Sequence, residues 1–188
     1  MKGRDIPAVV SLDRLVFRDP WPESAYVQEL YFNPNAHYFV LELVDPAQAR
    51  SWHDHRRREA GRLLGFVGMR VEGKRGHIST LAVRSEWRGQ QLGEVLLLIA
   101  IDQAIRDGAH VLGLEVRLSN EVAQGLYAKY DFEVHSRLHR YYADGEDAYY
   151  LQTRLKGNSD YRARVQDRLD ELVATLQIKW THSNDGSE

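Results

Sequence analysis

Cysteine is absent from this 188-residue chain. Its absence excludes a disulfide framework, a thiolate metal site and a cysteine nucleophile, and it fits a reducing cytoplasm. A large excess of charge of one sign is also lacking, since 25 Lys and Arg residues against 27 Asp and Glu residues give a formal net charge of −2. This balance argues against binding nucleic acid by bulk electrostatics, although it is compatible with a local basic patch.

Long hydrophobic runs are missing as well. No apolar stretch is long enough to span a bilayer, and the N-terminal MKGRDIPAVVSLDRL lacks the apolar core of a signal peptide. The composition, 43% hydrophobic and 28% charged, is ordinary for a globular protein, and the length predicts one domain with a proper core. We therefore expect a soluble, cytoplasmic protein.

Hydrophobic periodicity predicts an α/β domain with a mixed sheet, antiparallel at first, with a helical crossover in the middle and a hairpin last. Asp5 and Pro7 mark the start of a first helix, and Ser24 is a candidate cap for a second helix through Leu30. The other expected elements are strands at 37–44, 63–71, 77–83 and 109–118, helices at 92–106 and 119–130, a hairpin around Asp144-Gly145, a polar insertion at 45–62, an amphipathic helix at 158–180 and a disordered tail at 181–188.

A short polar loop, Arg88–Glu94, joins an apolar strand to the helix at 92–106. Free backbone amides at such a junction, together with the helix dipole, favour an anion such as a pyrophosphate, and Arg88 adds positive charge. The spacing of the glycines matches neither the phosphate loop of NTPases nor the dinucleotide fingerprint. On this evidence alone, a plain strand-to-helix turn remains an alternative.

Glu115 stands in the middle of the strand VLGLEVRL, where glutamate is disfavoured. It shares a strand face with Arg117, so one interpretation is a structural ion pair on a solvated face. The other is a carboxylate on the floor of a cleft that acts as a general base, through a water if needed. Tyr127, in the following helix, is either a core residue or an acid that protonates a leaving thiolate.

Taken together, LAVRSEWRGQQLGEVLL and LGLEVRLSNEVAQGLYAKYDFE resemble the core of the GNAT superfamily of N-acetyltransferases. Within it the chain resembles most the ribosomal-protein-alanine N-acetyltransferase branch, through FRDPW at 17–21 and RLHRYYADGEDAYYL at 137–151. The resemblance covers about 5–155, apart from the insertion. It implies a mostly antiparallel sheet, splayed at an acetyl-CoA site and flanked by helices, in an acetyltransferase domain at 1–157 to which the C-terminal helix is an addition.

The resemblance also implies roles for individual residues. Glu115 would be the general base, Tyr127 the general acid, and Asn120 a cofactor contact. The pantetheine arm would pair with the backbone of Leu81, Ala82 and Val83 like an added strand. The pyrophosphate would lie on the loop formed by Arg88, Gly89, Gln90, Gln91, Leu92, Gly93 and Glu94, and the groove for the acceptor would be walled by Phe17, Trp21, Tyr141 and Tyr142.

Direct attack of an amine on the acetyl-CoA thioester is favoured, because no cysteine exists to carry the acyl group. An α-amino group, with a pKa near ~8, needs less help to lose its proton than a lysine near ~10.4. We therefore expect the N-terminus of a protein, of the ribosomal-protein type, as the acceptor. A small amine or a lysine side chain is the first alternative, and a CoA-binding interaction module without catalysis is the second.

We expect no metal, because His53, Asp54 and His55 lack a third spaced ligand, and we read the adjacent Arg56–Arg58 as part of a solvated loop rather than an RNA contact. Neither a membrane nor direct nucleic-acid binding is expected, whereas a homodimer through the C-terminal helix is one alternative to that helix packing on its own chain.

Three departures from the family pattern stand out. Gln91 takes the place of the first glycine of the phosphate loop, which should remove the freedom to adopt a positive φ. Asp131 replaces the glycine that commonly ends the second conserved helix, a milder change because Asp tolerates the left-handed conformation. The usual first strand is nearly missing as well, since only Met1–Arg4 precede the first helix.

Overall fold

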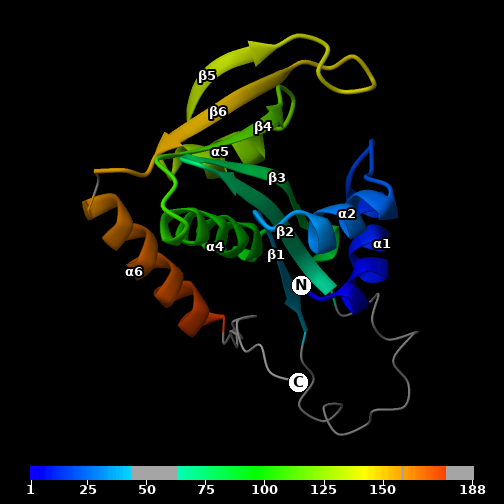
Figure 1. The fold of residues 1–188 in the computed structure, drawn as a ribbon, viewed down its shortest axis with the longest axis horizontal. Coiled ribbons are helices and arrows are strands. Elements are labelled where there is room, and N and C mark those ends of the chain that lie inside the picture. Colours follow the sequence, from blue (N-terminus) through cyan, green and yellow to red (C-terminus); the bar gives the residue numbers. More distant parts are fainter. Residues whose placement is uncertain (44–62, 158, 177–188) are drawn as a thin grey trace, which may run out of the picture.

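The computed structural model describes residues 1–43, 63–157 and 159–176 (Figure 1). The polar insertion with its histidines and arginines, and the tail at 181–188, lie outside the described residues. The elements are η1 (Gly3–Asp5), α1 (Ile6–Val16), α2 (Glu23–Phe32), β1 (Ala36–Glu42), β2 (Leu63–Glu72), β3 (Arg75–Val83), η2 (Ser85–Trp87), α4 (Leu92–Arg106), β4 (Val111–Arg117), α5 (Glu121–Ala128), β5 (Glu133–Leu138), β6 (Ala148–Arg154) and α6 (Ser159–Thr175).

The strands form one sheet in the order β1-β2-β3-β4-β6-β5. Every neighbouring pair is antiparallel except β3 and β4, which are parallel because α4 carries the chain from one to the other. The mixed sheet with a central helical crossover and a closing hairpin is therefore confirmed.

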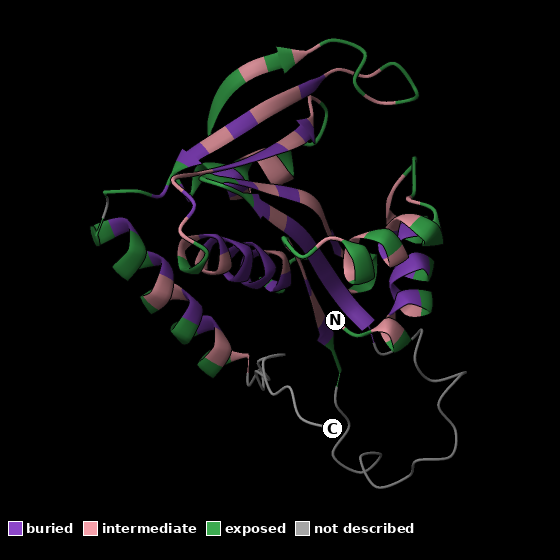
Figure 2. Ribbon diagram, viewed as in Figure 1, coloured by how far each residue is buried: buried purple, intermediate pink, exposed green. Residues whose placement is uncertain are grey.

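Helices cover both faces of the sheet and enclose a separate apolar core on each face (Figure 2). On one face, α1 and α2 pack over β1–β3, with Tyr26 and Phe66 fully buried. On the other face, α4 packs on the sheet together with α5, the helix that contains Tyr127. The helix α6 lies outside α4 (Figure 1). The sheet is therefore the middle layer, between α1 and α2 on one face and α4, α5 and α6 on the other.

The helix α4 is apolar on all sides, and α6 explains why. Residues 95–101 of α4 are all buried, one side against β2 and β3 and the other against α6. The residues of α6 that are buried are Tyr161, Val165, Leu169 and Leu172, at the spacing of one helical face. Of the interpretations open from the sequence, packing on its own chain is the one that the structure shows.

Local sequence signals predicted most ends of the helices and strands, but not all of them. Asn120 caps α5 by accepting a hydrogen bond from the Ala123 amide at 3.2 Å. Ser24 was wrong as the cap of α2, because the N-cap residue is Pro22 in an extended conformation and Ser24 already lies inside the helix. The closing hairpin is joined by a long loop over 139–147 instead of a tight turn at Asp144-Gly145. That loop becomes part of the site.

Candidate active site

The sheet splits open between β3 and β4. Their parallel pairing ends at Ile78 and Leu114, whereas β3 stays paired with β2 as far as Val83, and β4 with β6 as far as Arg117. A β-bulge leaves Ser79 without a partner in β2 at the position where the strands separate. Since bulges bend a strand and increase its twist, the bulge provides a local cause for the splay. We call this opening, between 79–83 and 115–117, the fork.

Glu115 lies at the base of the fork and is held by His77. A Glu115 carboxylate oxygen is 2.8 Å from His77 Nε2, and both side chains are mostly covered. The other ring nitrogen of His77 lies 3.4 Å from the Ser79 hydroxyl, which accepts a hydrogen bond from Arg70 at 3.0 Å. The interpretation of Glu115 and Arg117 as an ion pair was wrong, because the two side chains have different partners. His77 is a member of the site that the sequence did not reveal.

The loop between β3 and α4 takes the shape of an anion cradle. Gly89 and Gln91 both have positive φ angles, +75° and +62°. Among the residues that the structure describes, none accepts a hydrogen bond from the amides of Gln90 and Gln91, and the first amides of α4 have no acceptor within the helix. The expectation that Gln91 forgoes a positive φ was wrong: its backbone adopts the left-handed conformation and its side chain is exposed.

Arg88 and Glu94 are the first and last residues of this loop segment. The exposed Arg88 folds back, and its Nε donates to the carbonyl of Val83 at 3.3 Å. Glu94 is buried; burial opposes its ionisation, but hydrogen bonds from the Tyr130 hydroxyl at 2.6 Å and from Arg168 Nε at 3.3 Å lower its pKa on balance. Arg168 belongs to α6, so the C-terminal helix is bonded to the first turn of α4.

Tyr127 points into the apolar core beside the fork. It is almost fully buried, and its ring centroid lies 5.8 Å from that of Phe132. Burial raises the pKa of Tyr127 above its ordinary value, and the neighbouring Tyr142 adds to the shift. Its hydroxyl therefore stays protonated at neutral pH. Asp131, which follows this helix region, has a φ of +55°, as expected for a residue that tolerates the left-handed conformation.

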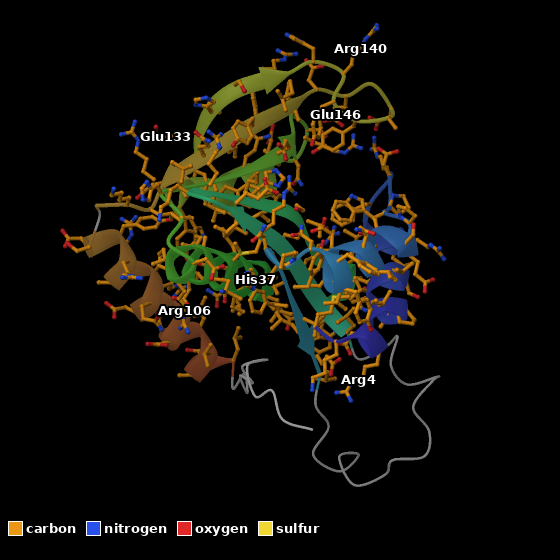
Figure 3. All side chains as sticks on the ribbon, viewed as in Figure 1. Arg4, His37, Arg106, Glu133, Arg140 and Glu146 are labelled. Atoms are coloured by element: carbon orange, nitrogen blue, oxygen red, sulfur yellow. The ribbon has the colours of Figure 1, made fainter. Side chains whose placement is uncertain are left out.

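Two loops with aromatic side chains flank the fork, at 17–22 and 139–147 (Figure 3). In the first, Trp21 packs at 5.6 Å, centroid to centroid, on Tyr26. In the second, Tyr141 and Tyr142 meet edge to face at 5.1 Å. Burial and the nearby Glu115 carboxylate raise the pKa of Tyr141, so this ring lies next to the carboxylate.

One cavity formed by the described residues lies away from the fork. That cavity, of about 840 Å³, is at the opposite end of β4, between α4 and α6. In the described ranges no three His, Cys, Asp or Glu side chains come together as metal ligands, and the motif of His53 and His55 lies outside those ranges. No helix within the described residues is long and apolar enough to cross a membrane.

Comparison with known proteins gives consistent matches. Residues 6–132 match the model of the acetyltransferase (GNAT) family. A Bacillus subtilis protein, provisionally named ribosomal protein bS18-alanine N-acetyltransferase, is 35% identical over 149 residues, covering 79% of this chain and 88% of that protein. An N-alpha-acetyltransferase of Sulfurisphaera tokodaii is 30% identical over 161 residues, covering 78% and 86%. Among solved structures, the NatC complex bound to Gag peptide and CoA superposes with a TM-score of 0.66 at 24% identity, covering 82% and 93%.

Proposed function

The chain belongs to the acetyltransferase (GNAT) family, and from this premise we propose that it transfers the acetyl group of acetyl-CoA to the α-amino group of a protein N-terminus. The relatives from Bacillus subtilis and Sulfurisphaera tokodaii carry names that specify this type of acceptor, an alanine of a ribosomal protein in one and an α-amine in the other. We propose ribosomal proteins as the substrate class and the cytoplasm as the place of action.

The observation that carries the proposal is the fork itself, with a carboxylate at its base and an aromatic loop on each side. The Glu115 carboxylate lies beside Tyr141 and raises the pKa of that tyrosine. A groove of this kind, walled by aromatic rings from two loops, suits an extended peptide whose first residue enters the fork. A small amine would need a more enclosed pocket to bury most of its surface.

The loop and the free edge of β3 fit acetyl-CoA, which supplies an acyl group activated as a thioester. Leu81, Ala82 and Val83 pair with β2 on one side only, so their other backbone edge faces the fork. We assign this edge to the pantetheine arm and the amides from Gly89 to Glu94 to the pyrophosphate. The positive φ at Gly89 and Gln91 turns successive amides toward one point, as in other anion sites. Asn120, at the end of the fork, caps α5 with its side-chain oxygen, which leaves its amide nitrogen for the cofactor.

In the transfer itself, we assign to Glu115 the removal of a proton from the acceptor ammonium, directly or through one water. His77 holds the carboxylate in place at 2.8 Å and offers a path for the proton toward Ser79. Tyr127 remains protonated because its pKa is raised, and it is assigned as the donor to the departing sulfur. With no cysteine in the chain, the amine attacks the thioester carbonyl directly. The C–N bond forms and the C–S bond breaks, and the second proton lost by the nitrogen replaces the proton that Tyr127 gives to the sulfur.

The test is an acceptor panel with acetyl-CoA and release of free thiol as the readout. It contains peptides with a free N-terminus, the same peptides with a blocked N-terminus and an internal lysine, and small primary amines. We expect rapid turnover with the free N-termini, slow turnover with the small amines and none with the blocked peptides. Turnover confined to the blocked peptides or the small amines would contradict the proposal. Calorimetric binding of acetyl-CoA with no turnover on any acceptor would instead indicate a non-catalytic CoA-binding module.

A further inference from the structure

Arg117, the last residue of β4, bonds to both loops that flank the fork. One terminal nitrogen lies 3.0 Å from the Asp19 carboxylate, in the loop between α1 and α2. The other lies 2.9 Å from Asp144 and 2.8 Å from Glu146, in the loop between β5 and β6. A single guanidinium therefore joins two segments that are distant in the sequence. Figure 3 shows Glu146 at the end of β6 that faces the loops.

Further contacts make this connection rigid. Arg18 in the first loop donates directly to Asp144 in the second at 3.3 Å. The second carboxylate oxygen of Glu146 accepts the Ser119 amide at 2.9 Å, and the Tyr142 ring stacks on the Arg117 guanidinium at 3.8 Å. Only 17% of the Arg117 side chain is exposed, so these ion pairs are screened less than ordinary surface pairs.

The position of Arg117 in the strand connects these contacts to the chemistry. Side chains two residues apart in a strand lie on the same face, about 7 Å apart. Arg117 is therefore the next residue beyond Glu115 on the same face of β4, at the mouth of the fork. Both aromatic loops are anchored at this point, Trp21 following Asp19 and Tyr142 preceding Asp144 in the sequence.

We propose that Arg117 is a positioning residue that fixes the separation of the two loops and so selects peptide acceptors against small amines. This inference rests on the proposed function, because it concerns the groove assigned to the acceptor. An extended peptide contacts both walls, so its binding depends on their separation. A small amine contacts only the base of the fork at Glu115, so its reaction does not.

The chemistry of the guanidinium explains why an arginine occupies position 117. The planar guanidinium offers donors in several directions at once, and here it serves three carboxylates from two loops while an aromatic ring stacks on its face. Lysine has a point charge and no planar face, so it would serve fewer of these partners.

The experiment compares Arg117→Gln, Asp19→Asn and the double variant with wild type. Arg137→Gln is the matched control, because Arg137 on β5 pairs with Asp147 at 2.7 Å in the same hairpin rather than with a carboxylate of the first loop. We expect Arg117→Gln to raise the KM for an N-terminal peptide about tenfold or more, with kcat and the rate with a small amine changed less than about threefold. Asp19→Asn should raise the same KM by a smaller factor, and the double variant should add little to Arg117→Gln.

Equal losses with peptide and small amine, fully additive effects in the double variant, or a KM effect equal to that of Arg137→Gln would overturn the inference. Hydrogen exchange tests the connection between the two loops without an activity assay. Asp19→Asn, a change at an exposed carboxylate that should leave the fold intact, is expected to speed amide exchange in 139–147, and unchanged exchange there would overturn the inference. If wild type acetylates no peptide, the proposed function fails, whereas the exchange result still decides whether the loops are joined.

Discussion

Replacing Glu115 with glutamine keeps the shape of the side chain and removes only its basicity. The glutamine amide introduced in Glu115→Gln can still hydrogen-bond to His77, which lies 2.8 Å from the carboxylate in the wild type, so the fork should keep its geometry. A positioned general base contributes about 10²–10⁴-fold to a rate. We predict a fall in kcat of about 10²–10³-fold at pH 7, which is about 3–4 kcal/mol of barrier at 1.36 kcal/mol per factor of ten.

The pH dependence separates loss of a base from a general disturbance. An acceptor α-amine with a pKa near ~8 is about one-tenth neutral at pH 7 and about nine-tenths neutral at pH 9. The deficit of Glu115→Gln should therefore shrink by about tenfold between these values, because the solvent then removes the proton that residue 115 no longer takes. The assay is thiol release at saturating acetyl-CoA, with calorimetry to show unchanged affinity for acetyl-CoA.

Glu133→Gln is the matched control, since Glu133 is an exposed carboxylate on β5, at the end of the neighbouring hairpin away from the loops (Figure 3). It should leave kcat within about twofold. An unchanged kcat in Glu115→Gln, or a deficit that is the same from pH 7 to pH 9, would refute the assignment of Glu115 as the base. A parallel loss of acetyl-CoA affinity would indicate that Glu115 is structural.

Three further predictions concern the cradle and the buried groups around it. Tyr127→Phe should slow transfer by about tenfold or more with acetyl-CoA affinity unchanged, and full activity would remove its role as the acid. Gln91→Gly should leave acetyl-CoA binding equal or tighter in a calorimetric titration, since the left-handed conformation at +62° costs a non-glycine residue about 1 kcal/mol; a large loss would mean that the Gln91 side chain itself holds the cofactor. Glu94→Gln should lower the free energy of unfolding at pH 7 by about 1.5–3 kcal/mol, because charged hydrogen bonds to Tyr130 and Arg168 are weakened. The pKa of Glu94 is lowered in the folded state, so this stabilisation is present above the unfolded pKa near ~4.3 and is lost as the pH falls through the folded value. Denaturation at pH 7 and below pH 4 checks this, and an equal difference at both pH values would contradict it.

Much of the fold followed from local patterns. The helix α4 has the predicted bounds, Leu92–Arg106, because its start is marked by the loop and its end by Gly108. The alternation in β4 predicted the face of Glu115, since the period of a strand is two. The helix α5 lies within the predicted segment 119–130, and Asn120 is its N-cap.

The partners of the site residues could not be predicted in the same way. His77 and Glu115 are 38 residues apart and meet only through the parallel register of β3 and β4, which no local signal encodes. Arg117 pairs with carboxylates in two loops that are distant from it in the sequence. For Gln91 the local prediction was wrong. The intrinsic preference of glutamine argues against a positive φ, but the geometry of the strand-to-helix junction overrides that preference.

The position of the transferred acetyl group on a peptide distinguishes an α-amine acceptor from a lysine acceptor. The measurement is incubation of the enzyme and acetyl-CoA with a ribosomal-protein N-terminal peptide that has both a free α-amine and an internal lysine, followed by fragmentation mass spectrometry of the product. We predict a single acetyl group on the first residue, formed by wild type and strongly reduced in Glu115→Gln. An acetyl group on the lysine, or a peptide that stays unmodified while acetyl-CoA binds, would contradict it.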